Sequence, residues 1–346
     1  KAVVYGGPGR RALEDRPRPA IAAPTDAIVR VRRTTICGTD LHILKGDVPT
    51  VEPGRILGHE GVGVVDEVGP GVASFRPGDR VLISCITSCG RCASCKRGMY
   101  SHCEGGGGWI LGHRIDGTQA GYVRVPFADQ SLHALPAGAD EEALVMLSDI
   151  LPTGFECGVQ NGAVKPGDAV AIVGAGPIGL AALLTAQFYA PAELILVDTD
   201  PNRHEVARRL GAPQVVDAGA GDAAARILEL SGGRGVDVAM EAVGVPETFD
   251  LCQRIIAPGG HIANIGVHGR PVELRLDRLW DRNVTITTRL VDTVSTPMLL
   301  RAVSAGRLRP AELITHRFPL RDAMAAYDAF GAARRERALK VILEGD

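Results

Sequence analysis

The sequence has little excess charge and few aromatic residues. Its 346 residues carry a formal net charge of -2 at pH 7, and aromatic residues make up 4% of the chain. Proteins that bind nucleic acid or anionic membrane surfaces usually present a strong basic excess, so this balance disfavours both kinds of partner. The main basic concentration, Arg334, Arg335 and Arg337, is interpreted as a solvated helix face.

The sequence also lacks a convincing membrane segment, secretory leader or internal repeat. Residues 169–192 contain no charged side chain, but their glycines and two prolines indicate a strand, a turn and a helix. The first residues form a short strand pattern without the apolar core of a signal peptide, so we expect a cytoplasmic protein. The chain exceeds the length that one hydrophobic core usually supports, and we expect two domains.

Four of the eight cysteines lie in one short segment. Cys89, Cys92, Cys95 and Cys103 are spaced C-x2-C-x2-C-x7-C in a stretch rich in Gly and Ser. Short spacings of this kind let one loop wrap a zinc ion with four thiolates and no open position. A disulfide pair or an iron–sulfur loop is the alternative, which the missing leader and the cysteines elsewhere disfavour. We predict a structural zinc lobe over residues 85–108, apart from the catalytic chemistry.

A second set of metal-binding residue types lies upstream. Cys37, His59 and Glu60 offer a thiol, an imidazole and a carboxylate. A catalytic zinc keeps about three protein ligands and leaves a fourth position for water or substrate, and mixed sets of this kind suit it. Taken alone, each residue is more often a buried apolar side chain, a core histidine or a solvated charge. Their occurrence together with the four-cysteine lobe favours the metal site.

The pattern GAGPIG at residues 174–179 follows an apolar strand and opens an apolar helix. Gly174 allows a tight turn, Gly176 lets the backbone approach a pyrophosphate, and Gly179 lets helix and strand pack closely. Pro177 and Ile178 begin the helix, whose N-terminus faces the phosphates. The motif alone is weak, but the strand before it, the helix after it and an acid about twenty residues on complete a dinucleotide fingerprint.

That acid is Asp198, which is expected to accept hydrogen bonds from the adenosine ribose hydroxyls. A carboxylate there repels a 2′-phosphate, so the residue predicts NAD rather than NADP. Arg203 is a nearby cation with the opposite effect, but Asp200 lies between the two. Asp198 is also interpreted as a turn cap, since Pro201 follows it closely.

The order of expected elements divides the chain. Residues 1–150 are rich in Gly, Pro and β-branched residues at strand spacing, which predicts a catalytic domain of many short strands, and residues 292–346 are expected to return to it. Residues 151–291 alternate between strand and helix patterns, which predicts a parallel doubly wound sheet. The expected strands of this sheet are 169–175, 193–198, 236–243, 260–267 and 284–291. A helix over 320–330 and a closing strand over 339–343 follow. The cleft between the domains is the expected active site.

These features resemble the zinc-dependent medium-chain alcohol dehydrogenases, and in particular their bacterial tetrameric type. The resemblance covers essentially the whole chain. It rests on the CGTDxH motif from Cys37, the GHEGxG motif at 58–63, the four-cysteine segment, Thr153-Gly154 and the glycines of 174–179. It implies an α/β protein with a GroES-like, mostly-β catalytic domain and a Rossmann NAD-binding domain. It also implies two zinc ions per chain, one catalytic and one structural.

The resemblance implies that Cys37, His59 and Asp149 bind the catalytic zinc. From the residues alone, Asp149 is interpreted as the N-cap of a helix. Glu60 resembles a carboxylate that lies beside the metal and transiently replaces water or substrate. Asp40 resembles the carboxylate that orients His59 by accepting its other ring N–H.

Thr39 and His42 occupy the positions of the family's proton relay, which runs from the alcohol through the nicotinamide ribose to the surface. A hydroxyl can accept one proton while donating another, and histidine exchanges protons near neutral pH. Taken alone, Thr39 is a turn residue and His42 a surface helix residue. A catalytic zinc would act as a Lewis acid that lowers the pKa of an alcohol hydroxyl and so favours hydride transfer to the nicotinamide.

The resemblance also assigns cofactor contacts. Lys340 corresponds to a cation that reaches the pyrophosphate, whereas Gly38 replaces a cation that other members use for the same phosphate. Further contacts are expected at Thr153, Val243, Gly266 and Val267, of which the last three end later strands, where open sheets place their ligands.

The resemblance implies a small alcohol, or the matching ketone or aldehyde, as the substrate, and Cys85, Ile86 and Trp109 are expected to line its pocket. If Trp109 narrows the pocket, small secondary or short primary alcohols are favoured; packing within the lobe is the alternative for this residue. Two other functions compete. The first is a polyol or threonine dehydrogenase, since these enzymes share the CGTDxH motif. The second is a zinc- and NAD-binding protein that has lost catalysis, which the presence of all the expected catalytic residues disfavours. The family implies a homotetramer, or a dimer, formed through the edge strand near 284–291.

Overall fold

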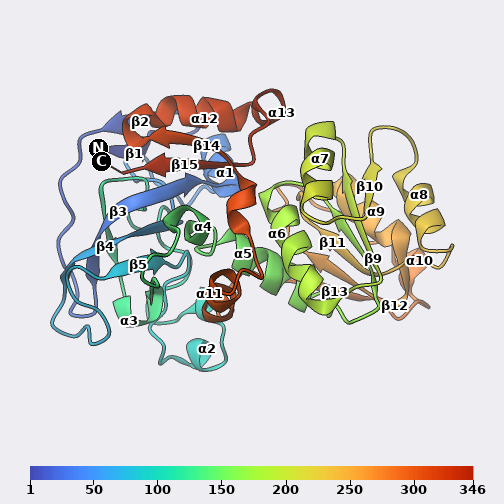
Figure 1. Cartoon of the computed structure of the whole chain (residues 1–346), viewed down its shortest axis with the longest axis horizontal. Coiled ribbons are helices and arrows are strands. Elements are labelled where there is room, and N and C mark those ends of the chain that lie inside the picture. The colour runs from blue at the N-terminus through green and yellow to red at the C-terminus, as the bar shows by residue number, and fades with distance from the viewer. Residues whose placement is uncertain (346) are drawn as a thin grey trace. The chain divides into compact units, whose positions relative to one another are not determined.

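The computed structural model describes residues 1–345, which form two compact units (Figure 1). The first unit comprises Lys1–Asp149 together with the C-terminal segment that begins at Asp292. The second unit comprises Ile150–Val291. The chain therefore leaves the first unit, builds the second from one continuous segment and returns to complete the first.

The first unit is built mainly from β-strands. Its large sheet has the order β14-β15-β3-β4-β5-β7, with β6 paired to β3, while β1 and β2 form a separate sheet. The strands are β1 Ala2–Tyr5, β2 Arg11–Glu14, β3 Ala27–Ile36, β4 Gly61–Val68, β5 Arg80–Ile83, β6 Tyr122–Val125, β7 Leu132–Ala134, β14 Ile314–Pro319 and β15 Lys340–Glu344. β15 pairs antiparallel with β3, so the returning segment extends this sheet. The closing strand expected over 339–343 is β15.

The long strand β3 organises this unit. Seven of its ten residues, AIVRVRRTTI, are β-branched or alanine, types that suit a pleated and half-buried surface. Val29 and Val31 lie fully or almost fully buried in a core with Val81 and Val123 from the neighbouring strands. Each buried valine contributes about 1.5–3 kcal/mol relative to an exposed one. The strand runs directly into Cys37.

The first unit also contains short helices. They are α1 Gly38–Lys45, α2 Ala93–Lys96, α3 Ala128–Ser131, α4 Glu141–Val145, α11 Thr296–Ser304, α12 Ala323–Gly331 and α13 Ala333–Glu336, with 3-10 turns η1 Tyr100–His102, η4 Pro310–Leu313 and η5 Leu320–Asp322. The expected helix over 320–330 is thus divided between η5 and α12. Ile43 of α1 and Tyr327 of α12 share one core cluster with Ile36 and Leu57. This cluster fixes the helix that follows Cys37.

The second unit contains a six-stranded, all-parallel sheet in the order β10-β9-β8-β11-β12-β13. Its strands are β8 Ala169–Val173, β9 Glu193–Asp198, β10 Gln214–Asp217, β11 Val236–Glu241, β12 Ile256–Asn264 and β13 Thr285–Thr288. All five residues of β8 are buried, as expected for a parallel strand covered by helices on both faces. Strand β10 was missing from the expected set, because its four residues QVVD form no apolar run and only one is buried.

The helices of the second unit are α5 Ile150–Thr153, the π-helical turn η2 Gly154–Gln160, α6 Pro177–Ala186, η3 Gln187–Tyr189, α7 Pro201–Arg209, α8 Ala223–Leu230, α9 Pro246–Ile255 and α10 Leu276–Leu279. The uncharged stretch 169–192 contains β8, a turn, α6 and η3, as its glycines and prolines predicted. Within residues 1–345, none of the helices has the length and apolar character needed to cross a membrane.

Candidate metal centres and nucleotide-binding edge

The four cysteines of the lobe converge. The ligand atoms of Cys89, Cys92, Cys95 and Cys103 all lie within 4.8 Å of one another, and Cys89 Sγ is 4.0 Å from Cys95 Sγ. In a tetrahedral site with zinc–sulfur bonds of about 2.3 Å, sulfur atoms lie about 3.8 Å apart. All four are free thiols. The set therefore fits a closed zinc site and offers no disulfide.

Backbone N–H groups point at these sulfur atoms. Cys95 N and Glu104 N each lie 3.4 Å from Cys92 Sγ, and Cys89 N lies 3.2 Å from Cys103 Sγ. The N–H groups of Cys95 and Glu104, that of Cys95 first, lower the pKa of Cys92 to about 6. Burial and the adjacent Cys92 raise the pKa of Cys95 to about 12. The thiolate form is thus favoured at Cys92 and disfavoured at Cys95. A bound cation would offset the repulsion between the two negative charges.

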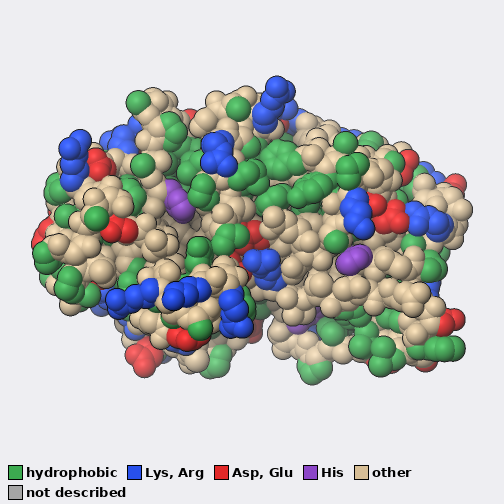
Figure 2. Space-filling view, turned by 90° about the horizontal axis from the view of Figure 1, so that it is seen from below, with side chains coloured by type: hydrophobic (Ala, Val, Ile, Leu, Met, Phe, Trp, Pro, Cys, Tyr) green, Lys and Arg blue, Asp and Glu red, His purple; other side chains and the backbone are tan. Residues whose placement is uncertain are grey.

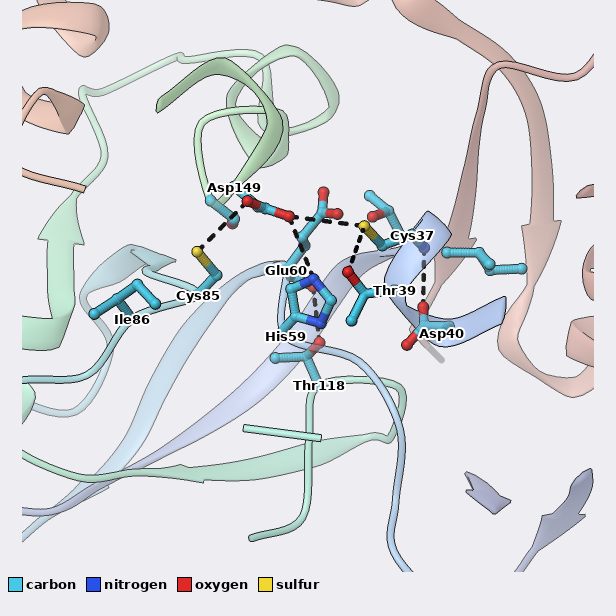
Figure 3. A network of polar contacts seen from close by, with 12 residues as sticks. Cys37, Thr39, Asp40, His59, Glu60, Cys85, Ile86, Thr118 and Asp149 are labelled. Atoms are coloured by element: carbon cyan, nitrogen blue, oxygen red, sulfur yellow. Dashed lines mark hydrogen bonds and ion pairs between the residues drawn. The ribbon is translucent and has the colours of Figure 1, made fainter. Parts of the chain in front are cut away.

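The second candidate metal centre is buried. Cys37 follows β3, His59 and Glu60 precede β4, and Asp149 ends the first part of the unit (Figure 3). Ligand atoms of these four side chains lie within 4.8 Å of one another. Asp149 Oδ2 is 3.7 Å from Cys37 Sγ and 3.3 Å from His59 Nε2. The structure therefore brings together the three residues expected to bind a catalytic zinc, and it adds Glu60.

The electrostatics of this centre suit a cation. Burial raises the pKa of the Cys37 thiol. Burial by itself lowers the pKa of His59, but the contacts with Asp149 and Cys37 raise it well above the usual value. Without a cation, the cluster holds protons on its thiol and imidazole. A divalent ion would displace those protons and pair with the thiolate and carboxylate, so the donor set fits zinc.

Glu60 is engaged by Lys340. The ammonium Nζ donates to both carboxylate oxygens at 2.7 and 2.8 Å, and both side chains are 1% exposed. Lys340 Nζ also donates to Thr35 Oγ1 at 2.9 Å. In this structure the charge of Lys340 is therefore directed at Glu60 in the interior of the first unit, and its contact with a pyrophosphate stays a prediction.

Asp40 also departs from expectation. Its Oδ2 accepts from the backbone N–H of Cys37 at 2.9 Å and from Gln119 Nε2 at 3.0 Å. Its buried Oδ1 has no hydrogen-bond partner among the described residues, so the predicted bond from the His59 ring is not formed. Asp40 sits in the first turn of α1 and reaches back to the residue before the helix, as a capping carboxylate does. It therefore supports Cys37 rather than His59.

Thr39 and His42 lie on the same side of α1, three residues apart. Thr39 Oγ1 is 3.7 Å from Cys37 Sγ, which places its hydroxyl beside the candidate metal centre (Figure 3). The His42 side chain is 30% exposed, and its Nδ1 pairs with Asp47 Oδ2 at 2.8 Å. A partly buried hydroxyl and a more exposed imidazole thus share one short helix.

The three expected pocket residues lie near this centre to different degrees. Cys85 is buried, and its Sγ is 3.7 Å from Asp149 Oδ1 (Figure 3). Ile86 follows it and is also buried. The Trp109 ring meets the His59 ring edge-on at 6.3 Å and lies against His113 at 4.5 Å. Trp109 therefore packs beside His59, an expected metal ligand, and is not confined to the lobe.

The GAGPIG turn of the second unit has the geometry of a phosphate cradle. Gly174 has φ +109°, a conformation that other residues rarely adopt. A Cβ on Gly179 would lie 1.7 Å from the carbonyl oxygen of Gly174, so only glycine permits this approach of helix and strand. A Cβ on Gly176 would meet nothing closer than Arg203 Nη1 at 4.0 Å. Gly176 is the N-cap of α6, and Pro177 and Ile178 form its first turn. The space beside Gly176 thus fits a dinucleotide pyrophosphate.

Asp198 lies at the end of β9, next to this turn. Its carboxylate accepts from the N–H groups of Ala175 at 2.7 Å and Asp200 at 2.9 Å. Arg203 Nη1 is 3.5 Å from Asp198 and its Nε 3.9 Å from Asp200. Asp198 therefore links the glycine turn to the start of α7, and Arg203 is held by carboxylates.

The remaining expected cofactor residues lie at strand ends of the same unit. Val243 is 45% exposed and Val267 61% exposed, which is unusual for such side chains. A Cβ on Gly174 would meet Val243 Cγ2 at 2.6 Å, so Val243 adjoins the glycine turn. A Cβ on Gly266 would meet Gly244 N at 2.3 Å, so the two valine-bearing loops touch. Thr153 ends α5, and Gly154 after it packs against α6.

Together, a Rossmann-type unit with a dinucleotide turn and a β-rich unit with one closed and one mixed zinc-type ligand set define a zinc-binding, nucleotide-dependent oxidoreductase. Comparison with known protein families supports this class. The family models described as "Alcohol dehydrogenase GroES-like domain" and "Zinc-binding dehydrogenase" match residues 23–137 and 177–304.

Individual relatives match along the whole chain. The structure of zinc-dependent alcohol dehydrogenase 2 from Streptococcus pneumonia is 55% identical, with a TM-score of 0.96 and coverage of 100% of this chain and 98% of that one. An alcohol dehydrogenase from Thermus sp. ATN1 is 35% identical, with a TM-score of 0.91 and 99% of each chain covered. An alcohol dehydrogenase from Cupriavidus necator is 36% identical over 99% of this chain and 98% of its own. The chain belongs to the zinc-dependent medium-chain alcohol dehydrogenases.

Sequence reasoning missed several residues that support the metal centre. Gln119 and Tyr327 form a buried chain of hydrogen bonds to Asp40. Thr34 and Thr118 hold the backbone oxygen of Glu60 at 2.6 and 2.8 Å (Figure 3). None of these belongs to a motif, and their burial, which would indicate a role, is visible only in the structure.

Proposed function

We propose that the protein catalyses the reversible, NAD-dependent oxidation of small secondary or short primary alcohols at a zinc ion held by Cys37, His59 and Asp149. The pairing of Glu60 with Lys340 carries this proposal. Because Lys340 occupies both oxygens of Glu60, three ligands remain at the centre. A zinc site with three protein ligands keeps a position for substrate, whereas the four-cysteine lobe has none.

Bound there, zinc supplies Lewis acidity toward an alcohol oxygen and thereby favours loss of its proton. The chain supplies the route for that proton. The Thr39 hydroxyl, beside Cys37, accepts from the alcohol, and the partly exposed His42 passes the proton to solvent. Asp47, paired with His42, holds the imidazole in place. The buried surroundings of Cys37 and His59 keep bulk water from the reacting atoms.

NAD is the proposed hydride acceptor. The open space beside Gly176 and the N-terminus of α6 support binding of its pyrophosphate. Asp198 supports a free 2′-hydroxyl on the ribose and opposes a 2′-phosphate. Arg203 lies near enough to offset this, but its pairing with Asp198 and Asp200 reduces its charge toward a ligand. Val243, Gly266 and Val267 supply the apolar surface for the rest of the cofactor.

Trp109 supports a small substrate. Its ring lies edge-on to His59, so it limits space on one side of the metal centre, with Cys85 and Ile86 as further pocket residues. A small molecule is also the kind of partner that the surface suggests, since side chains of both charge signs share the face shown in Figure 2.

We further propose self-association through the edge strand β13, as a tetramer or a dimer. Large apolar side chains are exposed before, along and after this strand: Val272, Leu274, Leu276, Trp280, Ile286 and Leu290. Trp280 is 78% exposed. An unpaired strand edge flanked by such side chains favours pairing with a second copy. A cytoplasmic location is also proposed, because all eight cysteines are free thiols, which persist in reducing compartments.

The test is reduction of NAD⁺ and NADP⁺, followed by absorbance, with primary, secondary, polyol and amino alcohols on protein whose zinc content has been measured. About two zinc ions per chain and NAD⁺-dependent turnover of a simple alcohol are expected. Turnover restricted to polyols or threonine would assign the related substrate class. A preference for NADP⁺ would show that Arg203 outweighs Asp198. Binding of zinc and NADH without turnover of any alcohol would overturn the proposal.

A further inference from the structure

Gln119 is a fully buried amide that contacts the segment before α1 and the turn before His59. It is 0% exposed and lies between β5 and β6, outside any helix or strand. Its side-chain Nε2 donates to the carbonyl oxygen of Thr35 and to Asp40 Oδ2, each at 3.0 Å. Its Oε1 accepts from the hydroxyl of Tyr327 at 2.8 Å. Both N–H donors of the amide and one acceptor position of its oxygen are therefore used.

The orientation of this amide is fixed by its partners. A backbone carbonyl and a carboxylate accept hydrogen bonds but do not donate them, so the NH₂ group must face Thr35 and Asp40. The carbonyl end then faces Tyr327, whose hydroxyl is free to donate. Tyr327 is 2% exposed and belongs to α12, so a residue 208 positions away anchors the carbonyl end of the amide while the NH₂ end meets Asp40.

Gln119 reaches both segments that carry metal ligands. Asp40 Oδ2, which it contacts, also holds the N–H of Cys37, and Thr35 lies two residues before Cys37. On the other side, Gly58 precedes His59 with φ +92°, and a Cβ there would meet Gln119 Cγ at 2.6 Å. The turn that presents His59 therefore rests directly on the methylene groups of Gln119.

We propose that Gln119 is a positioning residue of the catalytic zinc centre: it holds Cys37 and His59 at the spacing that retains the metal, and Tyr327 anchors the carbonyl end of its side chain. This role rests on the proposed function of Cys37, His59 and Asp149. Groups that orient metal ligands without touching the ion typically change metal affinity about 10–100-fold when they are replaced. Gln119 acts on two of the three ligands.

The experiment measures zinc retention in the full-length, zinc-loaded protein during titration with a chelator, with a colorimetric zinc indicator as the readout. The four-cysteine zinc is an internal reference in every sample. Gln119→Met keeps the length of the side chain and removes its polar atoms. We expect it to lose one of two zinc ions at a chelator concentration about 10–100-fold lower than wild type. Tyr327→Phe, which removes only the hydroxyl, should shift the same step by a smaller factor.

Gln253→Met is the matched control. Gln253 is also a buried bridging amide, which donates to Glu273 O at 3.0 Å and accepts from Arg275 N at 2.8 Å in the second unit. Its replacement removes comparable hydrogen bonds far along the chain from the metal ligands, so both zinc ions should remain at wild-type affinity. A general loss of stability would instead affect both zinc steps, or both glutamine variants, alike.

Two results would overturn the inference, and they are distinct. If Gln119→Met retains both zinc ions as wild type does, the role of Gln119 is wrong while the metal centre stands. If wild type binds only the zinc of the lobe, the proposed catalytic centre fails and the role of Gln119 fails with it. Should Gln119→Met not fold, Tyr327→Phe decides: selective loss of one zinc supports the inference, and unchanged retention of both contradicts it.

Discussion

The two candidate metal centres of the first unit are built in opposite ways. The lobe takes four identical ligands from 15 consecutive positions, Cys89 to Cys103, and two of them are only partly buried. The other centre takes a thiol, an imidazole and a carboxylate from positions as far apart as Cys37 and Asp149, all buried. A local loop is therefore enough to form one candidate site, whereas the fold of the whole unit must assemble the other site.

This difference explains how each centre is supported. In the lobe, the backbone N–H groups of the loop itself point at the sulfur atoms. At the other centre, called the dispersed centre because its ligands lie far apart in sequence, distant side chains give this support. Lys340 pairs with Glu60, and Gln119 holds Asp40. A closed site needs only a loop of the right length, but an open site must keep three ligands in place while leaving one position free.

The largest expected effect comes from Cys37→Ser, which removes a thiol from the dispersed centre alone. The variant should bind one zinc instead of two, because the lobe keeps its four thiols. Alcohol oxidation should fall at least about a thousandfold, since Lewis-acid stabilisation amounts to several kcal/mol and each 1.36 kcal/mol is tenfold in rate. Zinc analysis and NADH formation measure both. Cys252→Ala, at a buried cysteine outside either ligand set, is the control. Two bound zinc ions with normal turnover in Cys37→Ser would refute the assignment.

Lys340→Met should have the next largest effect. It leaves the Glu60 carboxylate buried without its ammonium partner, and breaking a buried ion pair in this way costs about 3–5 kcal/mol. The freed carboxylate is then available to the metal position, so turnover should fall at least about tenfold while the lobe is unaffected. Denaturant unfolding and turnover report the two effects.

The partner substitution tests the cause. Adding Glu60→Gln to Lys340→Met removes the uncompensated charge, so the double variant should regain much of the lost stability. A single variant as stable as wild type, or a double variant no better than the single one, would contradict the importance of this pair.

How far the sequence could predict each centre follows from the same contrast. The cysteine spacing indicates the lobe because the information is local, and the fold class and family follow from motifs that are equally local. Asp149 was interpreted from residues alone as a helix cap, and only the family resemblance made it a ligand. Its contacts with Cys37 and His59 span 112 and 90 positions, and no periodic pattern encodes such distances.

Two of the contacts that sequence reasoning missed share this property. Lys340 contacts Glu60 across 280 positions, and Tyr327 contacts Gln119 across 208. Asp40 was expected at His59, but its position in the first turn of α1 directs it to the N–H of Cys37. Tertiary packing decides which neighbour a buried polar group meets, and motifs indicate only that such a group exists. Strand β10 was missed for a local reason, its weak apolar pattern.

Cys92→Ser removes a thiol from the lobe alone and should affect activity least among the metal-site variants. The protein should keep one zinc, and turnover at low temperature should change by less than about tenfold because a closed site takes no part in the chemistry. The thermal midpoint should fall by at least about 2 °C, since the loop loses the ion that orders it. Calorimetry and a turnover assay before and after mild heating measure this. A thousandfold loss of turnover with the catalytic zinc in place would break the distinction between the two centres.

The smallest expected effect concerns the stability of a strand scaffold formed by β5, which precedes the lobe, and its partner β7. His133 of β7 pairs with Leu82 of β5, the strand that leads toward Cys85 and the lobe. Burial lowers the pKa of His133 to about 4. An unfolded chain binds this proton near pH 6.5, whereas the folded one resists it until about pH 4, so stability is complete above pH 6.5 and declines as pH falls toward 4. Between pH 7 and 5 the loss should be on the order of 1 kcal/mol.

His133→Gln should remove that part of the pH dependence, because glutamine does not titrate in this range. The comparison is the slope of unfolding free energy against pH from 7 to 5 in wild type, in His133→Gln and in His102→Gln, whose side chain is exposed. His102→Gln should keep the wild-type slope. If all three slopes coincide, protonation of His133 does not govern the scaffold, and the acid sensitivity of the first unit must arise at the metal ligands, which zinc-loaded and zinc-free samples would separate.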